Sequence, residues 1–256
     1  MSFFKVEEKA NVIHLILNRG DKYNALHVDM LSEFADVVKR VSEMPGQIVI
    51  LSGEGPGFCA GGDLAMMKET GDEKKYHQVM NDIEAIVKTL YTLPKLVISA
   101  VHGSAVGLGL SIALASDYVM AEADASVSMN FIGIGLAPDG GGHFWLEQRL
   151  GTHQAKQFAW NGQQLSAKEA YDVKLIDLVV QGNVREAAEQ LAMEWSHRPV
   201  QSMVATKNIY HQHGLELLER YLAEERENQW QLRNSHDHQE GVQAFLEKRK
   251  PSFRGN

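Results

Sequence analysis

Short β-branched, apolar runs alternate with helical patterns over the first 180 residues of this 256-residue chain, and this rhythm limits the possible folds. Apolar residues recur at helical spacing between the first two runs and again before the third. The alternation predicts an α/β fold of βαβ units with right-handed crossovers. Strands are predicted at 12–18, 47–53, 96–103, 118–123 and 175–180.

Strand signals stop after about residue 184, and the rest of the chain has only helical patterns. We therefore expect a core over 1–196 and a helical region over 197–256. The joint is expected at HRPVQS (197–202), because Pro199 can begin a helix. Helices are predicted at 184–197, 199–212, 214–233 and 239–249.

Composition excludes several classes of protein. Apolar residues make up 44% of the chain and charged residues 23%, which is an ordinary globular balance. No apolar run reaches the roughly 18 residues needed to span a bilayer, and the N-terminus lacks a signal-peptide pattern. Cys59 is the only cysteine, which excludes an intrachain disulfide and fits a reducing compartment. We therefore expect a cytoplasmic protein.

The net charge of −8 argues against broad binding of nucleic acid or of an anionic membrane. An anionic ligand would need a local basic patch, and the tail KRKPSFR (248–254) is one candidate. The alternative is that this tail is only a solvated terminus. The histidine pairs at 211/213 and 236/238 have no accompanying ligand pattern, so we expect no metal site.

Three glycine-rich stretches lie where predicted strands lead into helices, at 53–67, 102–117 and 133–145. They contain no phosphate-binding P-loop pattern, and the first βαβ unit lacks the dinucleotide-binding GxGxxG pattern. Free N–H groups at helix starts stabilise negative charge, and two that converge can hold a developing oxyanion. The alternative is that the glycines only form tight turns.

Several separated motifs give the chain its resemblance to a known family. LNRGDKYNALHVDML, FCAGGDL, AVHGSAVGLGLSIALASDY and EGVQAFLEKRKPSF occur in the order found in the crotonase superfamily, the enoyl-CoA hydratases and isomerases. The chain resembles this family over nearly its whole length. The resemblance implies an acyl-CoA substrate, a spiral of ββα turns, and a C-terminal helical region that packs a trimer or a dimer of trimers. No permanently bound cofactor is implied, since coenzyme A belongs to the substrate.

The resemblance also assigns an oxyanion hole for the thioester to the backbone amides of Gly62 and Leu108. Typical hydratases of the family carry two glutamates that position and activate a water. The corresponding positions here are Ser111 and Phe131, neither of which is a carboxylate. Phe131 cannot accept a proton, and a serine without an adjacent base is a poor substitute.

Asp139, in LAPDGGGHFW (136–145), is therefore the expected catalytic residue. Some isomerases of the superfamily use one acidic residue in a P-[D/E]-G loop as their sole acid and base. An apolar pocket would raise the pKa of this aspartate toward a useful value. The alternative is that Asp139 only caps the following helix.

The substrate pocket is expected to include apolar side chains near Asp139, and these are Met66, Phe131, Leu136 and Phe144. The resemblance places the nucleotide of coenzyme A near Lys22, Ala25 and Leu26, with Ala25 using its backbone. It also suggests that Lys248 reaches the phosphates, including those bound to a neighbouring subunit. In the alternative interpretation, both lysines are only solvated charges.

The sequence thus favours an enoyl-CoA isomerase that shifts a double bond through an oxyanion-stabilised dienolate. One alternative is a hydratase that uses Asp139 and a differently held water. Another is nucleophilic attack by Asp139 on an aromatic acyl-CoA, which requires a histidine base that the sequence does not identify. A third is an acyl-CoA-binding or scaffold protein without catalysis.

Overall fold

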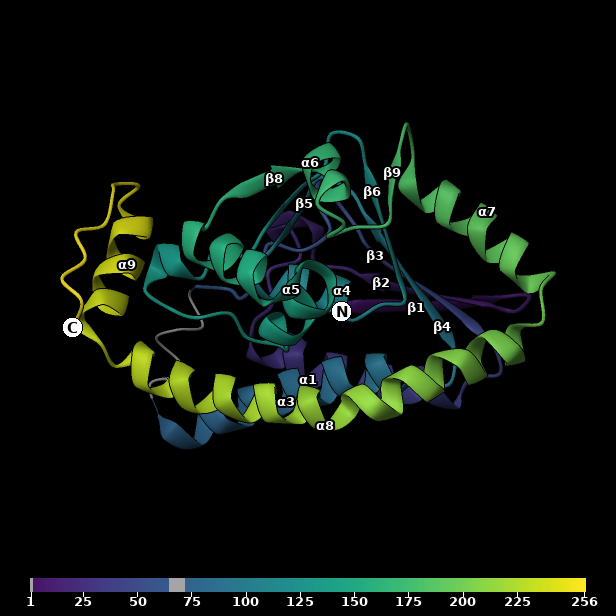
Figure 1. The fold of residues 1–256 in the computed structure, drawn as a ribbon, viewed down its shortest axis with the longest axis horizontal. Helices are drawn as coiled ribbons and strands as arrows, with labels where there is room; N and C mark the ends of the chain where they lie inside the picture. Colours follow the sequence, from purple (N-terminus) through teal and green to yellow (C-terminus); the bar gives the residue numbers. More distant parts are fainter. Residues whose placement is uncertain (1, 65–71) are drawn as a thin grey trace.

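Two β-sheets form the centre of the fold (Figure 1), which the computed structural model describes for residues 2–64 and 72–256. The six-stranded sheet has the order β1-β2-β3-β4-β6-β9, with β1 and β2 antiparallel and the other neighbours parallel. Its strands are β1 (Phe4–Lys9), β2 (Val12–Leu17), β3 (Ile48–Gly53), β4 (Leu96–Val101), β6 (Tyr118–Glu122) and β9 (Leu178–Val180). The three-stranded sheet contains β5 (Ser104–Val106), β7 (Ser126–Ser128) and β8 (Gln164–Ser166).

The order of the elements gives the predicted spiral of ββα turns. For example, β4 and β5 precede α4, and β6 and β7 precede α5. The helices are α1 (Val28–Glu43), α3 (Glu73–Thr92), α4 (Leu108–Leu114), α5 (Gly142–Asn161), α6 (Ala167–Asp172), α7 (Val184–Ser196), α8 (Val200–Arg233) and α9 (His236–Leu246), with 3₁₀ turns η1 (Gly20–Lys22) and η2 (Ile132–Ile134).

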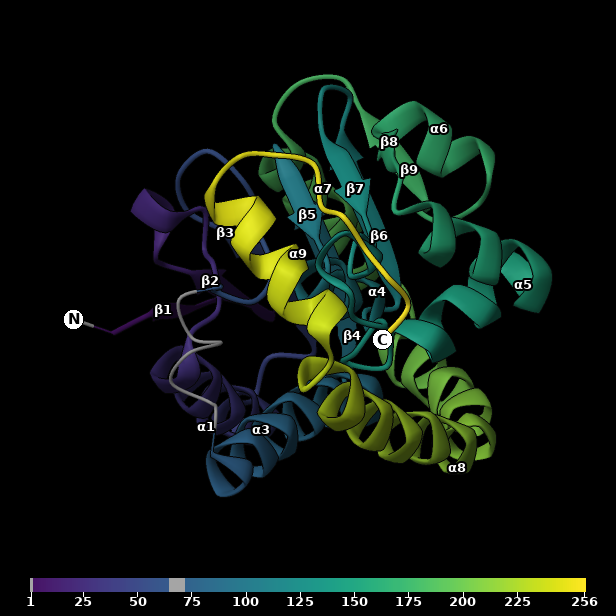
Figure 2. The same ribbon diagram turned by 90° about the vertical axis from the view of Figure 1, so that its left-hand side faces the viewer.

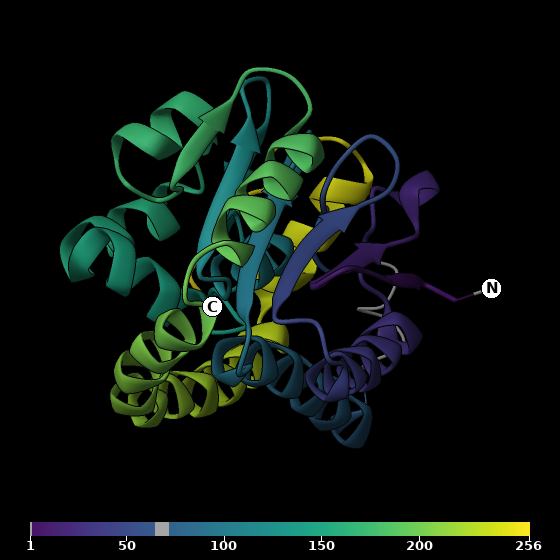
Figure 3. The same ribbon diagram turned by 90° about the vertical axis from the view of Figure 1, so that its right-hand side faces the viewer.

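The central strands β3 and β4 of the six-stranded sheet are buried on both faces. Along β3, Val49 and Leu51 belong to the main core, whereas Ile48 and Ile50 belong to a second cluster. This alternation follows from the two-residue period of a strand. The second cluster also contains Trp195 of α7, and Figure 3 shows this green helix lying across that face of the sheet. The near-continuous apolar strands are typical of a parallel sheet covered on both sides.

The five predicted strands are present with shorter ends, and four strands were not predicted. Three of the missed strands, β5, β7 and β8, have three residues each, which is too short for a periodic signal. The fourth, β1, is an edge strand with charged residues on its exposed face.

The predicted break between helices 199–212 and 214–233 is wrong, because α8 runs through Gly214 without interruption. A Cβ at this position would lie 2.3 Å from the hydroxyl oxygen of Tyr91. Gly214 therefore permits close packing of α8 on α3 and does not end a helix.

The C-terminal helices pack on the rest of the molecule. Helix α8 begins after Pro199, at the predicted joint, and lies beside α3 (Figure 2). It contributes Leu218 and Leu222 to the main core, and α9 packs against η2. The division at residue 196 falls at the end of α7, between two helices, and its status as a domain boundary stays a prediction. No helix within the described part is both long and apolar enough to cross a membrane.

Several large apolar side chains remain exposed on the helices, and the oligomer, which stays a prediction, would bury such side chains at its subunit contacts. Examples are Trp160 of α5 at 60%, Tyr210 of α8 at 73% and Phe245 of α9 at 62% exposure. We expect light scattering coupled to gel filtration to give a mass about three or six times that of the 28.5 kDa chain. A monomeric mass at micromolar concentration would contradict this prediction.

Candidate active site

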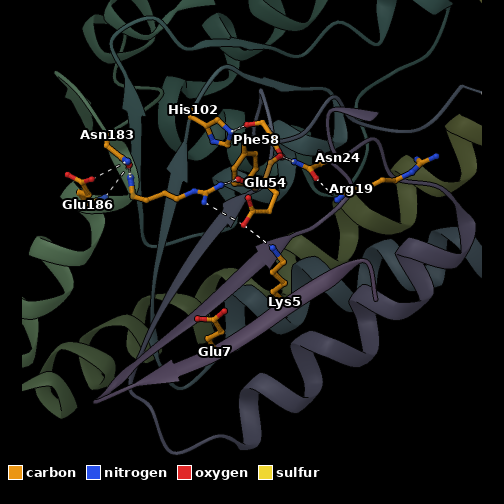
Figure 4. Close-up of polar contacts among 12 residues, drawn as sticks. Lys5, Glu7, Arg19, Asn24, Glu54, Phe58, His102, Asn183 and Glu186 are labelled. Atoms are coloured by element: carbon orange, nitrogen blue, oxygen red, sulfur yellow. Dashed lines mark hydrogen bonds and ion pairs between the residues drawn. The ribbon is translucent and has the colours of Figure 1, made fainter. Parts of the chain in front are cut away.

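Asn24 anchors the first glycine-rich stretch, as Figure 4 shows. Its side chain is fully buried, and its Nδ2 lies 2.9, 2.9 and 3.1 Å from the carbonyl oxygens of Glu54, Gly57 and Phe58. Its Oδ1 accepts a hydrogen bond from the backbone N–H of Arg19 at 2.8 Å. The backbone of Asn24 is left-handed, with φ of 55°, a conformation that asparagine tolerates. The role of this residue is not visible in the sequence, because a single buried polar side chain leaves no periodic signal.

A short parallel bridge continues this contact. The N–H of Leu26 donates to the carbonyl of Gly61, and the N–H of Asp63 donates to the carbonyl of Leu26, both at 2.8 Å. In this pattern the N–H of Gly62 points away from the bridge. It donates to no acceptor among residues 2–64 and 72–256. Arg19 strengthens the contact through a 2.8 Å ion pair with Asp63.

The second predicted donor lies at the start of α4. Leu108 is the first residue of this helix, so its N–H has no intrahelical partner. Gly107 precedes it with φ of +54° and provides no side-chain cap. The Leu108 N–H also finds no acceptor elsewhere in the described part of the chain.

Gly61 brings the two glycine-rich stretches into backbone contact. Its φ of +87° favours glycine, and an added Cβ would lie only 2.6 Å from the carbonyl oxygen of Val106. The same Cβ would lie 3.6 Å from the nitrogen of Leu108. The residues adjoining the two predicted donors are therefore neighbours, and their role as an oxyanion hole stays a prediction.

The third glycine-rich stretch packs against the second. A Cβ at Gly140 would lie 2.5 Å from Cδ1 of Leu108 and 3.2 Å from Cβ of Ser111. The Ser111 hydroxyl donates to the backbone carbonyl of Asp139 at 2.7 Å. Phe131 also lies near the start of α4, because a Cβ added at Gly107 would lie 3.5 Å from two of its ring atoms. The backbone of Asp139 is thus tied directly to α4, whose first residue is Leu108.

The carboxylate of Asp139 has one partnered and one unpartnered oxygen. Its Oδ2 accepts a hydrogen bond from Nε2 of Gln229 at 3.1 Å. Its Oδ1 is buried and has no hydrogen-bond partner among the described residues, although other atoms of Asp139 keep some exposed surface. An unpartnered buried oxygen of this kind is costly and needs an explanation.

Asp139 does not cap α5, so the capping alternative does not hold. The N-cap residue of α5 is Gly141, which makes no side-chain cap. The carboxylate of Glu225, on the distant helix α8, accepts from the N–H groups of Gly141 and His143 at 2.8 and 3.1 Å. It also binds Nδ1 of His143 at 2.8 Å. The only bond of the α5 start to Asp139 is through its backbone carbonyl, from the N–H of Gly142.

The surroundings of Asp139 raise its pKa to about 7. Burial is the largest cause, because it disfavours the charged form, and the negative charge of Glu225 adds to it. The hydrogen bond from Gln229 and the proximity of His143 act in the opposite direction. A carboxyl group with this pKa can both accept and donate a proton near neutral pH.

The other expected pocket residues lie in different surroundings. Leu136 lines a cavity of about 880 Å³, together with Pro138, His143 and Tyr221. Phe144 packs instead in the core, with a ring centroid 5.6 Å from that of Tyr91 and only 1% of its surface exposed. Met66 lies outside the described residues.

The residues expected to meet the nucleotide remain predictions. Lys22 and Lys248 are exposed, at the end of η1 and just after α9. The carbonyl of Ala25 accepts from Arg19 at 2.6 Å, which leaves one lone pair available. The side chain of Leu26 is fully buried, and its backbone N–H and carbonyl are used in the bridge to Gly61 and Asp63. Leu26 therefore stabilises the backbone next to Ala25.

The metal-binding and nucleophilic alternatives gain no support from the described residues. Within the described residues, no three side chains of the His, Cys, Asp or Glu types cluster as a metal site would require. Cys59 is buried, and burial raises its pKa to about 12, so it stays a thiol rather than a nucleophilic thiolate.

Comparison with known proteins agrees with this geometry. The family model for enoyl-CoA hydratase/isomerase matches residues 7–256. The Bacillus subtilis (strain 168) protein YhaR, named for that family, is 44% identical over 253 residues, which cover 99% of each chain. The 1,2-epoxyphenylacetyl-CoA isomerase of Escherichia coli (strain K12) is 34% identical over 260 residues, covering 100% of this chain and 99% of that protein. The crystal structure of an enoyl-CoA hydratase from Mycobacterium avium subsp. paratuberculosis K-10 superposes with a TM-score of 0.89 at 28% identity, covering 98% of both chains.

The ββα spiral is the crotonase fold. Enzymes of this class act on acyl-CoA thioesters. This chain belongs to the enoyl-CoA hydratase/isomerase family.

The raised pKa of Asp139 predicts that Asp139→Asn stabilises the folded protein at alkaline pH. The folded state holds the Asp139 proton more tightly than the unfolded chain does, so this group lowers stability as pH rises from about 4 to about 7. At pH 8 the variant is expected to gain up to about 4 kcal/mol in free energy of unfolding. At pH 5 the gain should be less than half of that, as urea denaturation at the two pH values will measure.

The control is Asp124→Asn, the same substitution at an exposed aspartate. It should change the free energy of unfolding by less than about 0.5 kcal/mol at both pH values. An equal effect of Asp139→Asn at pH 5 and pH 8 would show that the Asp139 carboxyl is not desolvated.

Proposed function

We propose that the protein is an enoyl-CoA isomerase in which Asp139 is the acid and base. The observation that carries this proposal is the carboxylate of Asp139, beside the start of α4, which has a pKa of about 7 and a buried oxygen without a hydrogen-bond partner among the described residues. One carboxyl group is sufficient for a double-bond shift, because the same group can remove and return the proton.

The two positions at which the family's hydratases carry glutamates support isomerisation over hydration. The hydroxyl of Ser111 is fully buried and already donates to the backbone carbonyl of Asp139. Phe131 is 8% exposed and presents an aromatic ring. Neither side chain can accept the proton of an attacking water, and neither can hold that water as a second carboxylate would.

The proposed reaction begins with a 3-enoyl-CoA whose thioester carbonyl accepts from the N–H groups of Gly62 and Leu108. The ionised Asp139 removes a proton from C2, and the electron pair moves into the thioester to give a dienolate. The protonated Asp139 then returns the proton at C4, which leaves a double bond between C2 and C3. Backbone donors suit this chemistry because they are fixed before the negative charge develops.

The relatives include both reaction types, so the preference for isomerisation depends on the site residues. Similarity to 1,2-epoxyphenylacetyl-CoA isomerase over the full chain supports a CoA-thioester isomerase. The likeness to a hydratase crystal structure supports the shared fold. What separates the two reactions in this chain is the combination of Asp139 with Ser111 and Phe131.

We expect purified protein to convert 3-hexenoyl-CoA to 2-hexenoyl-CoA, with little hydration of crotonyl-CoA. Asp139→Asn should lower kcat by about 10²- to 10⁴-fold, because the amide cannot transfer the proton. Asparagine keeps an oxygen that can accept from Gln229, so binding of the CoA ester should remain near the wild-type value. Absorbance of the conjugated enoyl thioester measures turnover, and calorimetry measures binding.

Strong hydration of crotonyl-CoA that persists in Asp139→Asn would contradict the assignment of both the reaction and the residue. Binding of CoA esters without turnover of any acyl chain would instead identify a scaffold protein.

The proposed oxyanion hole predicts a separate effect of Gly61→Ala. A methyl group at this position would meet the Val106 carbonyl at 2.6 Å and displace the adjacent Gly62 amide. Loss of one such donor lowers kcat by about 10²- to 10³-fold. The matched control is Gly182→Ala, at an exposed glycine that also has a positive φ, of 102°, and no atom within 4 Å of the added Cβ.

Gly182→Ala should retain wild-type kcat despite a small loss of stability from backbone strain. Circular dichroism should show that both variants are folded. Full activity in folded Gly61→Ala would argue against the proposed donor at Gly62.

A further inference from the structure

Two buried polar side chains of α8 face the loop that carries Asp139. Glu225 and Gln229 are 3% and 4% exposed. They are four residues apart, about one helical turn, so they lie on the same face of α8. Their sequence neighbours Glu224 and Asn228 are exposed. Burial of two polar groups on one face of a helix is costly unless they bind specific partners.

Glu225 fixes the turn that follows Asp139. Its carboxylate accepts hydrogen bonds from the N–H groups of Gly141 and His143, and it binds the His143 ring. Gly141 has a positive φ of 76° and supplies no side chain of its own to cap α5. A negative charge at this helix start is favourable, so Glu225 replaces the missing cap from another part of the chain.

Gln229 fixes the carboxylate of Asp139 itself. Its Nε2 donates to Oδ2, whereas its Oε1 is buried and has no partner in the described part of the chain. The amide is oriented by this contact, because the opposite orientation would place its oxygen against the carboxylate. With Oδ2 held by Gln229, Oδ1 is the oxygen of Asp139 that has no hydrogen-bond partner within residues 2–64 and 72–256.

We propose that Gln229 and Glu225 are positioning residues for the acid and base of this enzyme: Gln229 holds Oδ2 of Asp139 so that Oδ1 transfers the proton, and Glu225 clamps the following turn. This inference rests on the proposed function of Asp139. The C-terminal helix α8 is thereby part of the catalytic site as well as of the fold.

The charges around Asp139 give this proposal a measurable consequence. Glu225 of α8 raises the pKa of Asp139, whereas the Gln229 hydrogen bond and His143 of α5 lower it. Tyr76 of α3 also faces Asp139, and its own pKa is raised by burial and by the Asp139 charge, so it stays neutral. Substitutions at the two α8 positions should therefore move the pKa of Asp139 in opposite directions.

The experiment is the pH dependence of kcat/KM for 3-hexenoyl-CoA isomerisation in full-length protein. Activity rises with pH as Asp139 loses its proton. In Gln229→Met this rise should move to higher pH by about one unit, because the hydrogen bond to the ionised form is lost. In Glu225→Gln it should move to lower pH by a similar amount, because a neighbouring negative charge is removed.

Gln229→Met should also lower kcat at least tenfold with KM within twofold, since Oδ2 is no longer held. Methionine has a similar length and helix propensity, so α8 should remain folded. The matched controls are Gln231→Met and Glu224→Gln, the same substitutions at exposed positions of α8. Both controls should keep the wild-type pH profile and kcat.

Unchanged pH profiles in folded Gln229→Met and Glu225→Gln would overturn the inference, as would shifts in the same direction. If Glu225→Gln does not fold, the profile and kcat of Gln229→Met decide alone. Activity in Asp139→Asn would instead overturn the proposed function. An inactive Asp139→Asn with unshifted profiles in the two α8 variants would leave the function intact and reject only the positioning roles.

Discussion

The close backbone approach of Gly61 to Val106 is the constraint on which the site depends. It requires the absence of a side chain at residue 61, because any Cβ would overlap the Val106 carbonyl. Asn24 and the Leu26–Gly62 bridge hold the same stretch from the other side. The segments that precede the two helix starts are thus held by backbone hydrogen bonds and by packing. A site built in this way is fixed before any ligand binds, which is what charge stabilisation by backbone donors requires.

The starts of α4 and α5 have the same backbone chemistry but different surroundings. Each is preceded by a glycine with positive φ and lacks a cap from its own side chains. At α5 the free N–H groups are bound by the buried carboxylate of Glu225. At α4 no such carboxylate is present among the described residues, and the N–H of Leu108 has no acceptor. The chain thus neutralises one helix terminus internally, and the other is the terminus at which we propose that the thioester oxygen binds.

Sequence alone predicted the α/β class and five strands of the main sheet, because these depend on local periodicity. It also pointed to Asp139 through a named motif, and the catalytic role of this residue stays a prediction. It did not predict β5, β7 and β8, which are too short to show alternation. It also predicted a break at residue 213, between two helices, although α8 is continuous there and Gly214 leaves room for Tyr91, more than 120 residues away. Asn24, Glu225 and Gln229 were missed for the same reason. Their partners are distant in sequence, and each resembles an ordinary surface residue until the tertiary structure buries it.

Burying the polar groups around Asp139 lowers the stability of the fold, and structural roles alone do not explain why they are buried. Oδ1 of Asp139 and Oε1 of Gln229 are buried and find no partner in the described part of the chain, and each such oxygen costs about 1–3 kcal/mol. An apolar pair at these positions would avoid that cost, and the turn would still be held by Glu225 and Ser111. A carboxylate placed in this way gains a pKa near neutrality and one oxygen free to exchange a proton. Both unpartnered oxygens belong to the contact between Gln229 of α8 and the carboxyl group of Asp139. The energetic cost of burying them is therefore better explained by proton transfer at Asp139 than by packing.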